Sequence, residues 1–188
     1  MLVQIGQLLV ETIFGFFVFL LLLRFYMQVF RAPFRNPVGQ FVTALTNWMV
    51  LPVRRVVPGM FGLDLSSLLL AWLVEAVMLF LLHAMRGAAL GGMPGSAALA
   101  ILMVAALELV RFSIYLLIGV VIVQVILSWV SPYNPLNSAL EGLTRPFYRI
   151  FRRFIPPIGG IDLSPLFVLL VAQILLIVLN GLTRSMGF

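Results

Sequence analysis

The sequence contains one polar pattern twice, 98 residues apart, and no other feature limits the possible folds as strongly. The first copy begins at Asn36 and the second at Asn134, and the two align without a gap. The matched pairs are Asn36/Asn134, Pro37/Pro135, Leu45/Leu143, Thr46/Thr144, Arg54/Arg152, Arg55/Arg153, Pro58/Pro156, Gly62/Gly160, Asp64/Asp162, Leu65/Leu163 and Ser66/Ser164. Because an internal repeat indicates one structural unit that occurs twice, we predict two units, over residues 1–95 and 96–188.

Long apolar runs on both sides of each copy place the chain among membrane proteins. Hydrophobic residues make up 63% of the sequence and charged residues 10%, whereas soluble domains carry about 25% charged residues. Four runs, at about 8–29, 63–82, 109–130 and 163–179, are long enough to cross about 30 Å of hydrocarbon as helices. The sequence therefore predicts an all-α membrane protein with four transmembrane helices.

A further apolar segment, 96–107, is shorter than a membrane span. Segments of this length extend a neighbouring helix, lie in the membrane interface or re-enter the membrane from one side. We leave these three alternatives open and favour a fifth span least.

The positions of the arginines predict how the spans are oriented. All twelve basic residues are arginine, and eight of them fall within segments 31–62 and 131–162. Only Arg86 and Arg184 fall on the opposite side of the predicted spans. Because arginine-rich loops remain in the cytoplasm, we predict that both repeated loops are cytoplasmic and that both termini lie outside. The two units then form two parallel two-helix repeats.

Each repeated loop has the spacing of an amphipathic helix. In the second copy, apolar residues recur at steps of three and four, at Leu136, Leu140, Leu143, Phe147, Ile150 and Phe154. The first copy has the same spacing at Val38, Val42, Leu45 and Met49. A basic amphipathic helix beside membrane spans is typical of an interfacial position. Asn134 and Pro135 predict the start of the second of these helices, and Pro52 and Pro146 predict a break or kink in each.

Two acidic residues follow these helices at matching positions. Asp64 comes after Arg54 and Arg55, and Asp162 comes after Arg152 and Arg153, with a turn rich in proline and glycine between them. Since a carboxylate near the membrane boundary is costly without a partner, we predict that each aspartate pairs with an arginine. The pairing either anchors the loop to the next helix or forms an interaction site shared by both repeats. At the start of the fourth span, Ser164 before Pro165 predicts an N-cap.

Polar residues also occur inside the predicted spans. Glu75 lies midway along the second span, Gln173 is its counterpart in the repeat, and Arg24 lies in the first span. Such residues either hold helices together or line an ion path. We favour a contact of Glu75 with Arg24 or with a glutamine. Glu108 and Arg111, near the predicted outer end of the third span, are interpreted as marking the membrane interface.

The sequence contains no pattern that indicates an enzyme. It has no cysteine and one histidine, so it offers no thiolate metal site or cysteine nucleophile. Its glycine-rich segment 91–95 lacks the lysine and hydroxyl residue of a phosphate-binding loop. We expect no catalytic residues, no metal and no cofactor.

The second copy resembles the YggT family, which includes bacterial YlmG proteins and their plastid relatives. The resemblance rests on Asn134-Pro135, on Leu143-Thr144-Arg145-Pro146, on the arginine and proline pairs within 152–157 and on the Gly-Gly-Ile-Asp-Leu-Ser-Pro run at 159–165. The first copy fits less closely, with Trp48 in place of Pro146 and Ser67 in place of Pro165. The resemblance covers most of the chain and implies a multi-pass protein of the bacterial inner membrane. It also implies links to cell division, membrane-complex biogenesis or osmotic stress.

These observations favour a non-enzymatic scaffold or assembly protein. The alternative is an oligomeric small channel or transporter subunit, because the spans contain polar residues. We expect the basic faces to contact anionic lipid head groups at the cytoplasmic surface, and we expect a membrane protein partner or a homo-oligomer. Nucleic acid is disfavoured because the polar faces carry arginine without aromatic side chains for base stacking.

Overall fold

The computed structural model describes residues 1–59, 62–86, 94–131, 133–155 and 162–185. The regular structure within these residues is helical, in the order span, non-spanning helix, span, and then the same again. The helices are α1 (Leu2–Val29), α2 (Pro37–Val56), α3 (Leu65–Met85), α4 (Pro94–Val130), α5 (Asn137–Arg152) and α6 (Ser164–Ser185). Four of them, α1, α3, α4 and α6, have the length and apolar composition of a membrane span. The prediction of an all-α membrane protein with four spans is confirmed.

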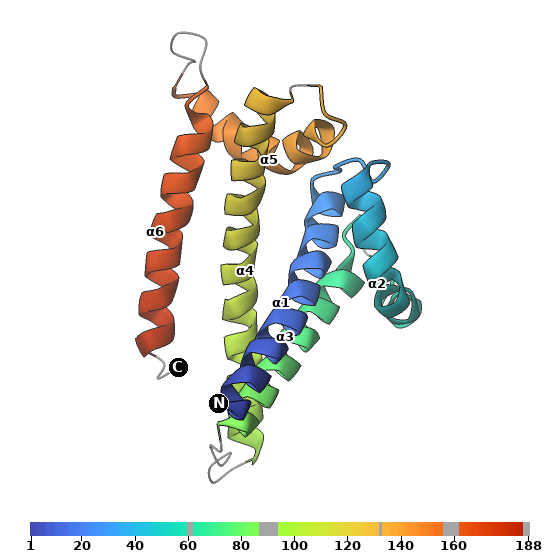
Figure 1. Ribbon diagram of the computed structural model, residues 1–188, viewed down its shortest axis with the longest axis vertical. Helices are drawn as coiled ribbons and strands as arrows, with labels where there is room; N and C mark the ends of the chain where they lie inside the picture. The colour runs from blue at the N-terminus through green and yellow to red at the C-terminus, as the bar shows by residue number, and fades with distance from the viewer. Residues whose placement is uncertain (60–61, 87–93, 132, 156–161, 186–188) are drawn as a thin grey trace.

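The two triplets of helices follow the same path (Figure 1). Helices α1 and α4 both run away from the end of the bundle that holds the two chain termini, and α3 and α6 return toward it. The short helices α2 and α5 lie toward the opposite end. The short helices therefore share one end of the molecule, as parallel repeats require.

The spans are longer than the sequence predicted. Helix α1 begins at Leu2 rather than near residue 8, and α6 continues to Ser185 rather than ending near 179. The segment 96–107 belongs to α4, a single helix that begins at Pro94. Of the alternatives for this segment, the helix extension is correct, whereas the interfacial helix, the re-entrant segment and the fifth span are wrong.

The short helices begin differently in the two repeats. In the first, the Asn36 side chain accepts a hydrogen bond from the backbone N–H of Gly39 at 2.9 Å and caps α2. In the second, Asn134 accepts from Leu136 at 2.9 Å, which makes a local turn, and α5 begins only at Asn137. The predicted helix start at Asn134 is therefore wrong.

The helix boundaries bear on two further local predictions. Pro52 and Pro146 lie inside α2 and α5, so neither proline ends its helix, and the kink remains a prediction. Ser164 is the first residue of α6 rather than its N-cap. Its backbone N–H donates instead to the Asp162 carboxylate at 2.9 Å, because the aspartate two residues earlier supplies the acceptor that a cap would provide.

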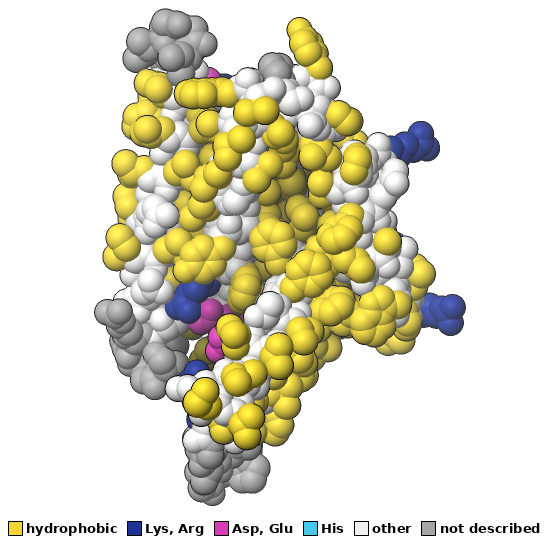
Figure 2. Space-filling model, viewed as in Figure 1, with side chains coloured by type: hydrophobic (Ala, Val, Ile, Leu, Met, Phe, Trp, Pro, Cys, Tyr) yellow, Lys and Arg dark blue, Asp and Glu magenta, His cyan; other side chains and the backbone are white. Residues whose placement is uncertain are grey.

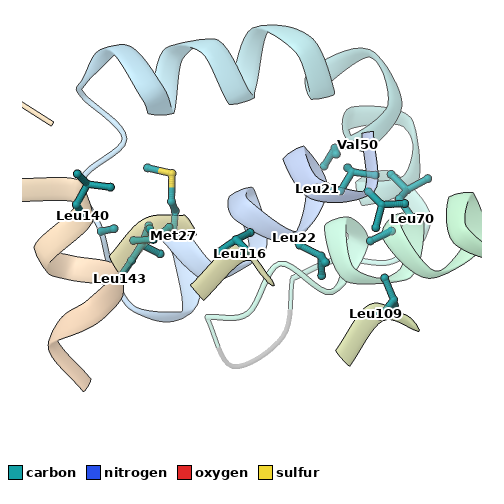
Figure 3. Packing of buried hydrophobic residues seen from close by; sticks show 13 residues of the cluster. Leu21, Leu22, Met27, Val50, Leu70, Leu109, Leu116, Leu140 and Leu143 are labelled. Atoms are coloured by element: carbon teal, nitrogen blue, oxygen red, sulfur yellow. The ribbon is translucent and has the colours of Figure 1, made fainter. Parts of the chain in front are cut away.

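The two repeats share one hydrophobic core (Figure 3). Its largest cluster combines residues of α1, α2 and α3 with residues of α4 and α5. Met27 of α1 lies beside Leu140 and Leu143 of α5, and Leu109 of α4 packs in the same cluster as Leu70 of α3. Because these contacts cross from one unit to the other, the core depends on both repeats.

Candidate functional site

In the first repeat, Asp64 is the centre of a buried ion cluster. Its side chain is 0% exposed and lies just before α3. The Nη2 of Arg54 donates to Asp64 Oδ2 at 2.7 Å, and the Oγ of Ser67 donates to the same oxygen at 2.8 Å. A second guanidinium, that of Arg24 on α1, places its Nε 3.4 Å from this oxygen. Two cations and a hydroxyl therefore compensate one desolvated carboxylate.

Arg24 connects this cluster to all three helices of the first repeat. Its Nη1 donates to the Oγ1 of Thr46 and to the Oδ1 of Asn47 on α2, both at 2.8 Å. One turn further along α1, Gln28 donates to the backbone carbonyl of Gly62 at 3.2 Å. The planar guanidinium presents several donors in a fixed geometry, so Arg24 holds α2 and the loop before α3 against α1.

The second repeat has a simpler and more exposed version of this arrangement. Arg152 donates to Asp162 Oδ2 through Nε at 2.9 Å and through Nη2 at 2.6 Å. The two side chains are 53% and 33% exposed. Burial on its own raises the pKa of Asp162, but hydrogen bonds from Ser164 and Arg152 outweigh it and hold this pKa below its usual range.

The two repeats differ in their ion clusters because of one sequence position, the one that Arg24 occupies in the first repeat. Ile122 occupies the place in α4 that Arg24 has in α1, so the second repeat has no buried guanidinium there. Instead, Gln124 of α4 accepts a hydrogen bond from the Thr144 hydroxyl of α5 at 2.6 Å. The first span of each repeat thus contacts the matched threonine, Thr46 or Thr144, through a different side chain. Sequence reasoning assigned these threonines no role, although their place among the repeated pairs was the available signal.

The structure brings together some of the predicted charged residues and not others. Arg54 contacts Asp64, and Arg152 contacts Asp162. Their neighbours Arg55 and Arg153 are exposed, and neither forms an ion pair with a described residue. Each aspartate therefore forms an ion pair with the first of its two neighbouring arginines, and the second arginine lies at the surface.

The predicted contact of Glu75 with Arg24 is wrong, because the Arg24 guanidinium is directed to Asp64 and α2, and no glutamine bonds to Glu75 within the described residues. Glu75 is 1% exposed, and neither of its carboxylate oxygens has a hydrogen-bond partner among the described residues. Its counterpart Gln173 is exposed on α6. The repeat-mates differ because α3 packs on α1, α2 and α4, whereas the main contacts of α6 within the described residues are with α4 and α5.

A second polar group lies within the spans, between α4 and α6. Arg111 forms an ion pair with Glu108 at 2.5 Å and donates to the Thr183 hydroxyl at 3.0 Å. Figure 2 shows a largely hydrophobic face that is interrupted in its lower half by adjacent acidic and basic side chains. The interpretation of Glu108 and Arg111 as interface markers stays a prediction: α4 continues beyond them toward residue 94, and their partner Thr183 lies in the last turn of α6.

The described residues contain no group of three or more metal-ligating His, Asp or Glu side chains. The polar clusters instead consist of arginines paired with single carboxylates, hydroxyls and amides. Such an arrangement can hold helices together and can bind anions where an arginine is left exposed.

Comparisons with known proteins agree with the two-unit pattern. The family model described as CCB3/YggT matches residues 3–85 and 103–183. An uncharacterized protein of Pseudomonas aeruginosa is 33% identical over 182 residues, which cover 95% of this chain and 90% of its own length. Uncharacterized protein YggT of Escherichia coli (strain K12) is 34% identical over 172 residues, 89% of this chain and 85% of that protein.

A plastid relative matches a shorter region. YlmG homolog protein 2, chloroplastic, of Arabidopsis thaliana is 39% identical over 67 residues, 35% of this chain and 24% of that protein. No solved structure matches the chain.

Proposed function

Because the chain belongs to the CCB3/YggT family, we propose that it is a non-enzymatic scaffold or assembly protein of the bacterial inner membrane. The arginine-rich loops 31–62 and 131–162 face the cytoplasm in this proposal, since such loops are retained there. Both termini then lie outside. The chain acts by holding a protein partner, or a second copy of itself, against the cytoplasmic surface of the membrane.

The observation that carries this proposal is the surface of α5. Arg145, Arg149 and Arg153 are exposed at the end of the bundle where α2 and α5 lie. None of the three forms an ion pair with a described residue. Cations left unpaired on a rigid helix are available to an acidic protein surface or to anionic head groups. The Asp162–Arg152 pair, next to them, fixes the end of α5 relative to α6.

Site-specific crosslinking tests the scaffold role. The chain contains no cysteine, so a single Arg153→Cys substitution can carry a photoactivatable crosslinker that is attached from the cytoplasmic side. We expect a discrete crosslinked protein, the same one from Arg149→Cys, in cells that express the chain at its native level. Gln40→Cys, on the exposed part of α2 in the other cytoplasmic loop, is the matched control and is expected to give no such product. Equal products from all three positions would contradict a partner surface on α5.

The channel alternative rests on Glu75, whose buried carboxylate has no partner among the described residues. Because Glu75 is 1% exposed, an ion can reach it only if the surrounding helices separate. We therefore expect that proteoliposomes holding the wild-type chain or Glu75→Gln both conduct protons and potassium no faster than protein-free vesicles, as measured with ion-sensitive dyes. Flux that the wild type supports and Glu75→Gln abolishes would establish the channel and overturn the scaffold proposal.

A further inference from the structure

Two recesses of opposite character meet between the repeats. The first is an apolar crevice of about 410 Å³ among α1, α4, α5 and α6. Its lining includes Tyr26 and Phe30 of α1, Leu117 of α4, Phe147 of α5 and Val178 of α6. Three of these four helices are membrane spans, so the crevice lies at the depth of the lipid chains.

The second recess is a basic groove of about 770 Å³ between the end of α1 and α5. Arg31, Arg145 and Arg149 line it, together with one acidic residue, Glu141. Three positive charges and one negative charge leave the groove with a net charge of +2. All three arginines are exposed, and none forms an ion pair with a described residue. The groove therefore has the charge to attract a phosphate group.

The two recesses share a wall. Phe30 lines both of them. On α5, Leu143 and Phe147 line the crevice, whereas the residues just before them, Gly142 and Pro146, line the groove. The rings of Phe30 and Phe147 meet edge to face with centroids 5.7 Å apart. A molecule with a charged head and an apolar tail can therefore occupy both recesses at once, passing over this aromatic pair.

Arg31 occupies a backbone position that favours glycine. The N–H of Arg31 donates to the Gln28 carbonyl at 3.1 Å, and the N–H of Ala32 donates to the Met27 carbonyl at 2.8 Å. This pattern is a Schellman motif with Arg31 at C′. Its φ of +53° is in the left-handed region, which glycine adopts without strain and other residues do not. The residue in this strained conformation is one of the three arginines that line the groove.

We propose that one anionic phospholipid binds between the repeats, with its phosphate in the basic groove and an acyl chain in the apolar crevice. A lipid is the occupant that fits because the tail recess opens at membrane depth while the head recess is cationic. This inference rests on the proposed function only in placing the α2/α5 end at a membrane surface. It requires no protein partner, so a failed crosslink and a failed lipid site are distinguishable results.

Native mass spectrometry of the delipidated chain in detergent tests the site. Titration with phosphatidylglycerol is expected to give a one-lipid adduct, whereas phosphatidylcholine with the same chains binds at least roughly tenfold more weakly. The double variant Arg145→Gln with Arg149→Gln weakens phosphatidylglycerol binding roughly 25-fold, since each basic residue near an anionic surface contributes about fivefold. Val178→Trp, which fills the crevice, weakens it as well. Arg55→Gln, on the exposed surface of α2 and outside the groove, leaves it unchanged.

Arg31→Gly separates lipid binding from folding. Glycine suits the left-handed position better than arginine, so this variant is expected to melt at or above the wild-type temperature while binding phosphatidylglycerol roughly fivefold more weakly. Unchanged lipid binding in Arg31→Gly would overturn the proposal. So would an Arg55→Gln loss as large as that of the double variant, which would indicate a diffuse surface charge.

Inorganic phosphate distinguishes a free anion from a lipid. We expect that phosphate alone raises the melting temperature far less than phosphatidylglycerol does at equal concentration. If phosphate has an equal effect and Val178→Trp has none, the groove binds a free anion and the lipid proposal is wrong. Competition of an acidic peptide for the groove in place of lipid would overturn the proposal in favour of a protein ligand.

Discussion

Replacing Arg24 with leucine is expected to lower the free energy of unfolding by about 3–5 kcal/mol. The loss is large because Asp64 is 0% exposed and Arg24 is the buried member of its two cationic partners. The substitution also removes the donor to Thr46 and Asn47. Melting in detergent, followed by tryptophan fluorescence, should shift downward by roughly 10 °C.

The second repeat supplies the matched control for this prediction. Arg152→Leu breaks the corresponding pair with Asp162, whose side chains are 53% and 33% exposed, so it should cost less than about 1 kcal/mol. Adding Asp64→Asn to Arg24→Leu should restore part of the lost stability, because Arg54, whose side chain is 40% exposed, compensates the buried carboxylate only in part. Equal losses in Arg24→Leu and Arg152→Leu would show that burial of the first cluster has no energetic role.

The asymmetry between the two clusters marks a limit of sequence reasoning. The repeat itself predicted which residues lie at equivalent positions, and the pairing of each aspartate with a nearby arginine needs only short-range spacing. The sequence did not predict which carboxylate pairs with Arg24, because Glu75 and Asp64 were both possible partners. The packing of α2 against α1 decides between them, since Thr46 and Asn47 draw the guanidinium toward the loop.

The sequence also did not predict which neighbours each span packs against. Glu75 and Gln173 are equivalent in the repeat, yet one is buried and the other exposed. Hydropathy identifies a span in either case, because lipid and protein interior are equally apolar. It does not show how many neighbours a span has. The groove at Arg31, Arg145 and Arg149 was missed for the same reason, since its residues come from different repeats.

Gly142→Val is expected to lower the free energy of unfolding by about 2–3 kcal/mol, because it adds a side chain where α5 of the second repeat packs closely on Ala32 of the first. A Cβ at Gly142 would lie 3.0 Å from the Cβ of Ala32 and 3.1 Å from its Cα. Ala32 follows the left-handed Arg31 in a fixed turn, so its backbone cannot move away without disturbing the end of α1. Gly119→Val is the control, since a Cβ at this helical glycine meets no atom within 4 Å, and it should be close to neutral.

The shared core predicts where the effect of Gly142→Val will appear. If the loop of the first repeat and α5 of the second stabilise each other, Gly142→Val should raise the rate of amide hydrogen exchange in both segments, around residues 30–36 and 137–145. Met27 packs with Leu140 and Leu143 directly beneath this contact, so protection at the end of α1 should fall with it. Faster exchange confined to α5 would mean that the second repeat loosens alone and that the repeats fold as separate units. Coupled loss in both segments would instead make the inter-repeat contact part of one cooperative structure.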